Sequence, residues 1–367
     1  MILFDRGPGG GAACFGNPRD LIIADHPDQV PAAFEAMVAA QAGGHWLAGY
    51  ASYELGYVME PRLRPLLPPD RDVPLLAFEV HDAPHAAASP APGHVSLSDL
   101  HPDWTAAGYE TAFRRLAGYI AAGDCYQVNL TMPLRGRAMG AAPDLYAALC
   151  ARQAVGHGAY VDLGIGPVIL SRSPELFFRI RGNRIETAPM KGTIPRDPDP
   201  ARDADLRARL AGSPKDRAEN LMIVDLLRND ISRICKVGSV QVPALYAVES
   251  YATVHQMISR VEGELLPGWD IPGLFQALFP CGSVTGAPKI RAMEIIRELE
   301  PAPRGVYCGA IGWIAPGGDA EFNVAIRTLS LYPGGEVVLN VGGGVVQDST
   351  AVGEYEEALW KARFARI

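Results

Sequence analysis

The sequence predicts an α+β protein in which neighbouring strands are mostly antiparallel. Two observations lead to this fold class. Helix-period segments and strand-like segments both occur along most of the chain, which is typical of a mixed fold. Several strand-like runs also follow one another between residues 306 and 341 with only turns between them. Strands joined by short turns pair antiparallel, whereas parallel neighbours need a long crossover, so antiparallel pairing is favoured over a regular βαβ repeat.

The composition is that of a folded protein with an acidic balance. The 367 residues are 48% hydrophobic and 20% charged, which is enough apolar material for a sizeable core. At roughly 150 residues per domain, this length suits about two domains or one large one. The formal net charge is −8 and no block of Lys or Arg occurs, which argues against a nucleic-acid or membrane surface as the main partner.

Targeting signals and disulfide patterns are not found in the sequence. No apolar run reaches the length of about 18 residues that a membrane span needs, and residues 1–6 lack the basic-then-apolar order of a signal peptide. The six cysteines lie far apart and form no C-x-x-C pair. We interpret them as free buried thiols in a reducing cytosol, and therefore expect a cytoplasmic protein.

One segment without apolar periodicity separates a shorter N-terminal region from the rest. Asp82–Leu100 is rich in Pro, Ala and Ser, which predicts a linker or a long surface loop. Before it, aromatic residues recur at short spacing in Trp46–Tyr57 and predict a strand. After it, helix and strand patterns alternate, and the polar, Pro-containing segment Ile194–Asp205 is expected to be a mobile loop.

Periodicity places the remaining elements. An apolar period near 3.6 residues predicts helices over Ala107–Ala122, Asp144–Gln153, Ala201–Leu210, Pro214–Ser232, Ala287–Glu300 and Val352–Phe364. Runs with strand composition predict strands over Tyr126–Leu134, Glu175–Arg181, Asn183–Thr187, Thr253–Glu264, Val306–Ile314, Phe322–Leu331 and Glu336–Val341.

Acidic side chains recur at helical spacing in two of these helices. Asp216 and Glu219 share one face of the helix that starts at residue 214, and Glu354 and Glu357 lie three residues apart in the last helix. An exposed charged face is the usual explanation for such a pattern. If the two helices converged, however, their carboxylates and water would suit Mg²⁺, which takes few protein ligands and leaves room for an anionic substrate.

Two other stretches are candidates for ligand binding. Gly342, Gly343 and Gly344 directly follow a predicted strand, where missing side chains permit close approach of the backbone to a ligand; a bulge or tight turn is the alternative. Lys191 lies between Met and Gly at a strand end. In a dry pocket its pKa would fall and its amine would become nucleophilic, whereas a surface lysine is the more frequent case. The residue pattern alone leaves both questions open.

These segments, in this order, resemble the chorismate-utilising enzymes. The similarity runs from about Tyr109 to Phe364, and weakly into Ala48–Tyr57. The matching motifs are YIAAGDCYQVNLT (119–131), SPE (173–175), PMKGT (189–193), ENLMIVDLLRND (219–230), VHQMISRVEG (254–263), PCGSVTGAPKIRAMEIIRELEP (280–301), RGVYCGAIG (304–312), NVAIRT (323–328) and GGGVVQDS (342–349). So many motifs in one order are a highly specific signal.

Two positions discriminate within this family. Gln127 stands where the similar isochorismate and salicylate synthases carry a lysine base. Lys191 lies in P-M-K-G-T, where anthranilate synthase component I usually reads P-I-A-G-T. A lysine here looks like the 4-amino-4-deoxychorismate synthase component I branch, an amino-group transferase of para-aminobenzoate and folate biosynthesis. Anthranilate synthase component I, of tryptophan biosynthesis, is the alternative within the family, and a catalytically silent chorismate-binding subunit is the alternative from another class.

The resemblance implies catalytic roles for three matching residues. In that branch the lysine, here Lys191, is understood to attack ring C2 while the C4 hydroxyl departs; ammonia then enters at C4 and expels the lysine. Glu175 matches the catalytic glutamate and is the candidate general acid. His255 matches a histidine near the ring, which would help in positioning or in acid–base chemistry.

The resemblance also implies the ligand sites. Glu219 and Glu357 match the ligands of an Mg²⁺ cofactor, with Asp216 and Glu354 in water-mediated or outer contact. The residues that match the substrate pocket are Gly192, Thr193, Tyr307, Arg327, Gly342, Gly343 and Gly344.

For the fold, the resemblance implies two antiparallel β-sheets packed face to face, with helices outside and the chorismate site in the cleft between them. Residues 1–100 then form an N-terminal region packed into the same unit as a catalytic region, residues 101–367, and the segment 82–100 becomes a crossing loop. The chain contains no glutaminase signature, so we expect ammonia from a separate glutamine amidotransferase subunit. No lyase domain follows, so the expected product is 4-amino-4-deoxychorismate.

Overall fold

Several helices begin at a residue whose side chain caps the N-terminus. The side chains of Thr105, Asp199, Ser213 and Thr350 accept hydrogen bonds from backbone N–H groups in the first turns of four helices. The computed structural model describes residues 1–88, 93–251 and 254–367. Its helices are α1 (Val30–Ala42), α2 (Leu55–Met59), α3 (Ala106–Ala121), α4 (Ala142–Arg152), α5 (Pro200–Gly212), α6 (Pro214–Ser232), α7 (Ile271–Leu278), α8 (Lys289–Leu299) and α9 (Ala351–Lys361). All six predicted helices are present, with ends shifted by three residues or fewer.

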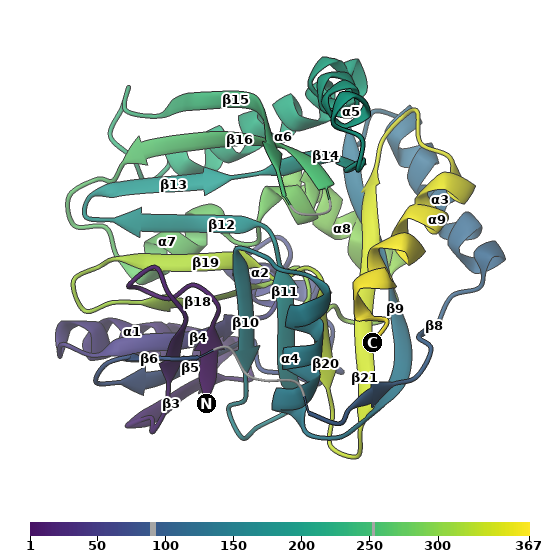
Figure 1. Cartoon of the computed structure of the whole chain (residues 1–367). Coiled ribbons are helices and arrows are strands. Elements are labelled where there is room, and N and C mark those ends of the chain that lie inside the picture. Colours follow the sequence, from purple (N-terminus) through teal and green to yellow (C-terminus); the bar gives the residue numbers. More distant parts are fainter. Residues whose placement is uncertain (89–92, 252–253) are drawn as a thin grey trace.

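The strands form two sheets in which every pair is antiparallel, as predicted (Figure 1). The first sheet has the order β17 (Gly286–Ala287), β9 (Gln127–Met139), β21 (Glu336–Val345), β20 (Thr328–Leu331), β11 (Val168–Ser173), β10 (His157–Val161), β1 (Ile2–Phe4), β2 (Ala13–Phe15) and β6 (His85–Ala86), with β7 (Ser96–Leu97) and β8 (His101–Pro102) also paired to β9. The second has the order β14 (Met190–Pro195), β16 (Val254–Glu264), β13 (Arg184–Ala188), β12 (Leu176–Arg181), β19 (Ala320–Val324), β18 (Ala310–Ile314), β4 (Trp46–Ala51), β5 (Leu76–His81) and β3 (Asp20–Ala24), with β15 (Gln241–Ser250) also paired to β16.

Apolar side chains from both sheets meet in a common core. Ile2, Phe15 and Ile169 of the first sheet belong to one buried cluster with Tyr50 and Trp313 of the second. Burying apolar surface stabilises the protein by roughly 25 cal/mol per Å², so this shared layer holds the two sheets together. The α+β fold of two packed antiparallel sheets is therefore confirmed.

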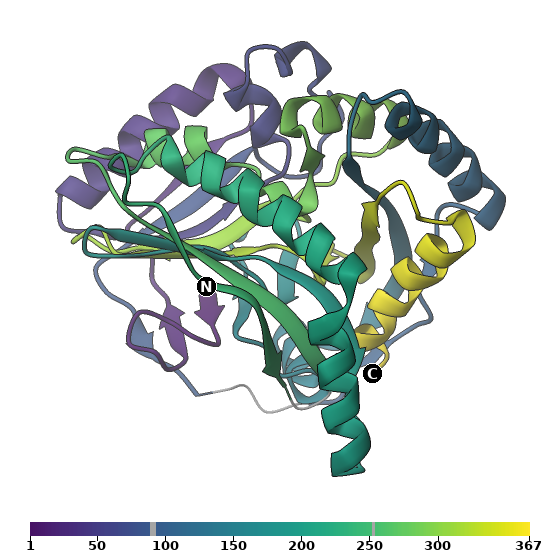
Figure 2. The same cartoon turned by 90° about the horizontal axis from the view of Figure 1, so that it is seen from above.

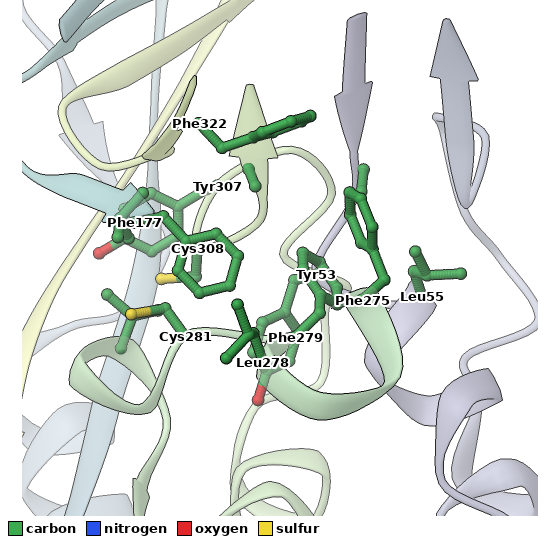
Figure 3. Packing of buried hydrophobic residues seen from close by; sticks show 14 of the residues in the cluster. Tyr53, Leu55, Phe177, Phe275, Leu278, Phe279, Cys281, Tyr307, Cys308 and Phe322 are labelled. Carbon is green, nitrogen blue, oxygen red and sulfur yellow. The ribbon is translucent and has the colours of Figure 1, made fainter. Parts of the chain in front are cut away.

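Helices cover the outer faces of the sheets. Helices α1 and α6 pack on the second sheet, as does α7 through Phe275, and Figure 2 shows α6 lying along the sheet. Helices α3, α8 and α9 pack against the β9 and β21 side of the first sheet. Figure 3 shows part of the helix–sheet core, where Phe275 of α7 lies edge-on to Phe322 of β19 at 5.6 Å between ring centroids. Within the described ranges, no helix is long and apolar enough to cross a bilayer.

N-terminal strands belong to both sheets. Strand β1 pairs with β10 in the first sheet, and β4 pairs with β18 in the second. Segment 82–100 was predicted to be a linker or loop, and in the structure it contains the short strands β6 and β7. Its residues 89–92 lie outside the described part of the chain.

Several strand predictions have the wrong extent. Strand β9 runs five residues beyond the predicted end at Leu134, β18 starts four residues after the predicted start at Val306, and three further predictions differ more deeply. The predicted strand Trp46–Tyr57 stops at Ala51, and Leu55–Met59 is helical, because the aromatic spacing did not distinguish the two states. The predicted strand Phe322–Leu331 is two strands, β19 and β20, which belong to different sheets. Between them Arg327 has φ +51, and this left-handed residue turns the chain from one sheet into the other.

The third error concerns the glycine triplet. Residues 342–344 do not follow a strand but lie inside β21, where they pair with residues 129–131 of β9. Glycine weakens strand propensity, which made the pattern look like a strand end, but the ladder to β9 overrides that preference. The predicted loop Ile194–Asp205 is likewise partly ordered, since β14 extends to Pro195 and α5 starts at Pro200. The predicted start of β16, Thr253, lies outside the described residues.

A buried carboxylate also connects the sheets. Glu321 of β19 accepts a hydrogen bond from Nε of Arg179 in β12 at 2.8 Å, and its other carboxylate oxygen lies 3.1 Å from Nδ1 of His157 in β10. Burial alone would raise the pKa of Glu321, but the contacts with His157 and Arg179 outweigh it and lower this pKa to about 2. The ionised carboxylate therefore stabilises the folded state.

We predict that Glu321→Gln lowers the free energy of unfolding at pH 7 by about 3 kcal/mol, because each tenfold change in proton affinity corresponds to about 1.4 kcal/mol. A carboxyl whose pKa is depressed in the folded state contributes above its unfolded pKa and loses that contribution as the pH falls. The gap between wild type and variant should therefore close between about pH 4.5 and pH 2, as measured by urea unfolding.

Glu336→Gln is the matched control, because Glu336 pairs with Arg135 at 2.8 Å but both side chains are about half exposed. Exposed pairs contribute about 0–1 kcal/mol, so this variant should stay near wild type. A destabilisation by Glu321→Gln that stayed constant from pH 7 to pH 2 would contradict the assignment.

Candidate active site

A cavity of about 500 Å³ lies where β21, β14, α6 and α9 meet. Residues of β14 in the second sheet and of β21 in the first line it, so the cavity lies at the junction of the two sheets. In Figure 1 the end of β14 points toward β21 and α9. The cavity is lined by all but one of the site residues predicted from the sequence, namely Glu175, Lys191, Gly192, Thr193, Glu219, Tyr307, Arg327, Gly342, Gly343, Gly344 and Glu357. The exception is His255.

Lys191 enters the cavity from a β-bulge. Met190 pairs with Ile258 of β16 and Thr193 with Gln256, so Lys191 and Gly192 together face the single residue Met257. Gly192 adopts φ +81, and a Cβ there would lie 2.8 Å from a carboxylate oxygen of Asp216. This position therefore requires glycine both for its backbone conformation and for space.

The amine of Lys191 packs against residues 342–344 of β21, which we call the glycine strand. A Cβ built on Gly344 would lie only 3.2 Å from Lys191 Nζ and 2.9 Å from the amide carbon of Gln127. Burial lowers the pKa of Lys191, the charge of Lys361 lowers it further, and the nearby carboxylates of Glu219, Glu175 and Glu357 oppose that shift. The sequence left open whether this lysine lies on the surface, and the structure places it in the pocket.

Glu175 immediately precedes β12 and is buried, with 5% of its surface exposed. Its Oε1 has no hydrogen-bond partner among the residues that the structure describes. Burial raises the pKa of Glu175 to about 7, although Ser283, Lys191 and Arg327 each act to lower it. A carboxyl in this state is partly protonated at neutral pH, as a proton donor needs to be.

Arg327 supplies a guanidinium inside the pocket. It lies in the crossing between β19 and β20, and its backbone carbonyl accepts a hydrogen bond from the N–H of Arg172. Burial lowers the pKa of Arg327, while the charge of Glu175 raises it. A partly buried guanidinium is suited to grip a carboxylate through two parallel hydrogen bonds.

Carboxylates of α6 and α9 line the same cavity, and those of α9 lie close to residues 342–344. A Cβ on Gly343 would lie 2.9 Å from Glu354 Oε2 and 3.7 Å from Glu357 Oε1. Burial raises the pKa of Glu219, and the charges of Asp216 and Glu354 raise it further. The helices that carry these side chains therefore do converge, as the magnesium hypothesis requires.

The donor set fits a divalent cation that shares its coordination with substrate and water. Within the described ranges, no three His, Cys, Asp or Glu side chains lie close enough together to form a metal site made by protein alone. Mg²⁺ commonly binds through one or two carboxylates plus waters and substrate oxygens, and Glu219 and Glu357 are such a pair. A lysine flanks each of them: Lys361 Nζ lies 2.8 Å from Glu357, and Lys215 Nζ lies 3.8 Å from Glu219.

The structure does not bring His255 to the pocket. Its Nδ1 lies 2.8 Å from Ser250 Oγ and its Nε2 lies 3.0 Å from Asp203 of α5. Successive side chains of a strand point to opposite faces of the sheet, so Gln256, the next residue, lines the cavity in its place. A role for His255 at the substrate ring therefore has no support in this geometry.

Several pocket residues were not selected from the sequence. Gln256 lies in the motif VHQMISRVEG (254–263) beside His255. Because side chains alternate between the two faces of a strand, the two-residue period is the signal that could have distinguished them. Asn129, Ser283 and Lys215 also line the cavity. Asn129 lies in β9, where nothing in the local pattern indicates which face meets the site.

Comparison with known proteins identifies the family. The profile of the chorismate binding enzyme family matches residues 77–366. Aminodeoxychorismate synthase component 1 of Klebsiella aerogenes is 45% identical over 253 residues, covering 69% of this chain and 56% of that protein. Anthranilate synthase component 1 of Streptomyces coelicolor is 41% identical over 288 residues, covering 76% of this chain and 54% of that protein.

The fold agrees with that of a solved relative. The crystal structure of anthranilate synthase component I from Streptococcus pneumoniae superposes with a TM-score of 0.81 at 26% identity, covering 100% of this chain and 92% of that one. The segments aligned to the two sequence relatives span just over half of those proteins' own lengths. Because the family profile covers most of the chain and the two-sheet fold matches, the chain belongs to the chorismate binding enzyme family.

Proposed function

We propose that this chain acts as component I of an aminodeoxychorismate synthase, converting chorismate and ammonia to 4-amino-4-deoxychorismate for para-aminobenzoate and folate biosynthesis. The observation that carries the proposal is the position of Lys191, whose amine lies inside the cavity against Gly344 and near Glu175 and Glu219. A protein that only binds chorismate has no need of such an amine.

Lys191 decides which carbon receives nitrogen. Its neutral amine forms a bond to ring C2, the two ring double bonds shift toward C4, the C4–O bond breaks, and the amine loses a proton to become a secondary amine. Ammonia then forms a bond to C4, the double bonds shift back and the C2–N bond breaks; the proton that the new amine loses balances the one that the departing Lys191 regains. An occupied C2 directs ammonia to C4, and the covalent intermediate divides one difficult substitution into two easier ones.

Glu175 donates the proton that turns the departing C4 hydroxyl into water. Its raised pKa keeps a proton available near neutral pH, and Arg327 and Ser283 adjoin it in the same wall of the pocket. The two groups have opposite requirements, since Lys191 reacts without its proton and Glu175 reacts with one. Burial favours the neutral form of each.

Charged groups around the cavity hold the substrate carboxylates. Glu219 and Glu357 would hold an Mg²⁺ ion, which when bound supplies positive charge to neutralise the ring carboxylate. Arg327, with Tyr307 and the backbone of residues 342–344, would bind the second carboxylate. The narrow glycine strand brings that backbone close to the ligand.

Ammonia would come from a glutamine amidotransferase subunit. The relative from Klebsiella aerogenes is named as a component 1, which supports a two-component enzyme. Free ammonium replaces that partner in an assay of the isolated chain.

The rival function is anthranilate synthase component I, supported by the 41% identity to the Streptomyces coelicolor protein. The two reactions share the pocket and differ in the carbon that nitrogen attacks. Lys191 favours the first function, because an unoccupied C2 would receive ammonia directly and give the ortho product.

We predict that chorismate, Mg²⁺ and ammonium yield 4-amino-4-deoxychorismate, detected by mass spectrometry of the product. Lys191→Ala should lower its formation by at least about 1,000-fold, because the nucleophile is lost while the fold is retained. Lys236→Ala is the control, since Lys236 pairs with Glu264 on the surface and does not line the cavity. Fluorescent anthranilate formed without an added lyase would instead establish the rival function.

We further predict a pH dependence due to Glu175. Because the general acid must be protonated, kcat/KM should fall with rising pH above about 7, the pKa of Glu175. Glu175→Gln should lower kcat by about 10²–10⁴-fold and flatten this alkaline limb. Persistence of the limb with the same midpoint in Glu175→Gln would assign it to another group and remove Glu175 from the mechanism.

A further inference from the structure

The bulge that carries Lys191 is fastened by one side chain on the neighbouring strand. Gln256 Nε2 donates to the carbonyl oxygen of Gly192 at 3.0 Å, and Gln256 Oε1 accepts from Thr193 Oγ1 at 2.8 Å. Gln256 is 8% exposed, and it lies directly opposite Thr193 in the pairing of β14 with β16. The two residues that follow Lys191 are therefore both bound by a single amide.

The amide orientation follows from these partners. A carbonyl oxygen can only accept, so the nitrogen of the amide must face Gly192, and the oxygen is left for the hydroxyl of Thr193. A bulge leaves its extra residue unpaired in the backbone ladder. The side chain of Gln256 supplies the hydrogen bonds to Gly192 and Thr193 instead. The contact thus replaces ladder bonds at the bulge, next to Thr193, where the regular pairing of β14 with β16 resumes.

The other side of the bulge is closed by α6. A side chain at Gly192 would collide with Asp216, so Gly192 is seated between α6 and β16. On the opposite face of β16, His255 contacts Asp203 of α5, which in turn accepts from Arg196 at 2.7 Å. Arg196, the residue after β14, is therefore also held in place. With the chain fixed on both sides, the bulge determines the direction of the Lys191 side chain.

We propose that Gln256 is a positioning residue for the nucleophile: its amide fixes the Lys191–Gly192 bulge so that the amine points at the reacting carbon. This proposal rests on the proposed function, in which Lys191 is the nucleophile. It adds Gln256 as a residue that acts on Lys191 through Gly192 and Thr193. Displacements of about 1 Å can lower the rate of a covalent step by about 100-fold, so the side chain that holds the bulge governs kcat. In the proposed function the substrate carboxylates bind elsewhere in the cavity, at Arg327 and at the Mg²⁺ ion that Glu219 and Glu357 would hold, so we expect the affinity for chorismate to depend little on Gln256.

The test compares three variants of the full chain. Gln256→Met keeps the length and removes both hydrogen bonds, Gln256→Glu keeps the acceptor for Thr193 but loses the donor to Gly192, and Thr193→Val removes only the hydroxyl. Circular dichroism and thermal unfolding first establish that each variant folds. Hydrogen–deuterium exchange of the peptide covering residues 189–195 then reports the bulge, with the peptide covering β12 as an internal reference.

We expect faster exchange at residues 189–195 in Gln256→Met, a smaller increase in Thr193→Val, and no change in β12. In the product assay, kcat of Gln256→Met should fall by about 100-fold with KM for chorismate unchanged, and Gln256→Glu should resemble Gln256→Met because the bond to Gly192 is lost in both. A merely structural role would raise KM and lower the unfolding temperature together with kcat.

The outcomes separate this proposal from the proposed function. Unchanged exchange at residues 189–195, or wild-type kcat in Gln256→Met, would overturn the positioning role even if Lys191 remains essential. If wild type instead makes anthranilate, the proposed function fails; faster exchange would then show that Gln256 fixes the bulge, and the claim that it aims a nucleophile would be overturned.

Discussion

The site depends on one amine, that of Lys191, being buried among carboxylates. Carboxylates near Lys191 favour its charged form, and burial opposes them by penalising any charge that is not solvated. The balance is adjusted by a second cation: Lys361 pairs with Glu357, neutralises part of the negative charge and disfavours a proton on Lys191. Three features bring these charged groups together without filling the cavity: the glycine strand, the bulge that carries Lys191, and the position of α9 beside β21.

Backbone geometry makes this crowding compatible with a stable fold. Residues 342–344 remain in the ladder with β9, so the strand is intact although these three residues place no side chains on the cavity wall. The crossing at Arg327 connects the two sheets and delivers the guanidinium to the same wall. Buried networks such as Glu321 with Arg179 and His157 hold the sheets in register away from the pocket. The cavity can therefore be acidic without depending on its own charges for stability.

Much of this arrangement could be predicted from the sequence, and the remainder depends on tertiary contacts. Apolar periodicity located α6 and α9, and motif order identified Lys191, Glu175, Glu219 and Glu357 as candidates. Periodicity failed where a strand was interrupted, as at Arg327, because a single left-handed residue leaves the composition of the flanking strands unchanged.

The face of a strand was the other feature that could not be read with certainty. His255 and Gln256 are adjacent, and the motif did not indicate which of them meets the cavity; pairing with β14 and contact with α5 decide it. Spacing also gave no reason to prefer a pocket over the surface for Lys191. That preference follows from Gly344 and α9, which lie far along the chain and which local patterns do not connect to residue 191.

The most direct test of this account is to trap the bond between Lys191 and the substrate. The protein is incubated with chorismate and Mg²⁺ without ammonia, quenched and digested, and the peptide that contains residue 191 is analysed by mass spectrometry. We expect this peptide to gain the mass of chorismate less one water, and to lose the addition when ammonium is supplied before quenching. An unmodified Lys191 in a preparation that rapidly forms 4-amino-4-deoxychorismate with ammonium would contradict covalent catalysis by this residue.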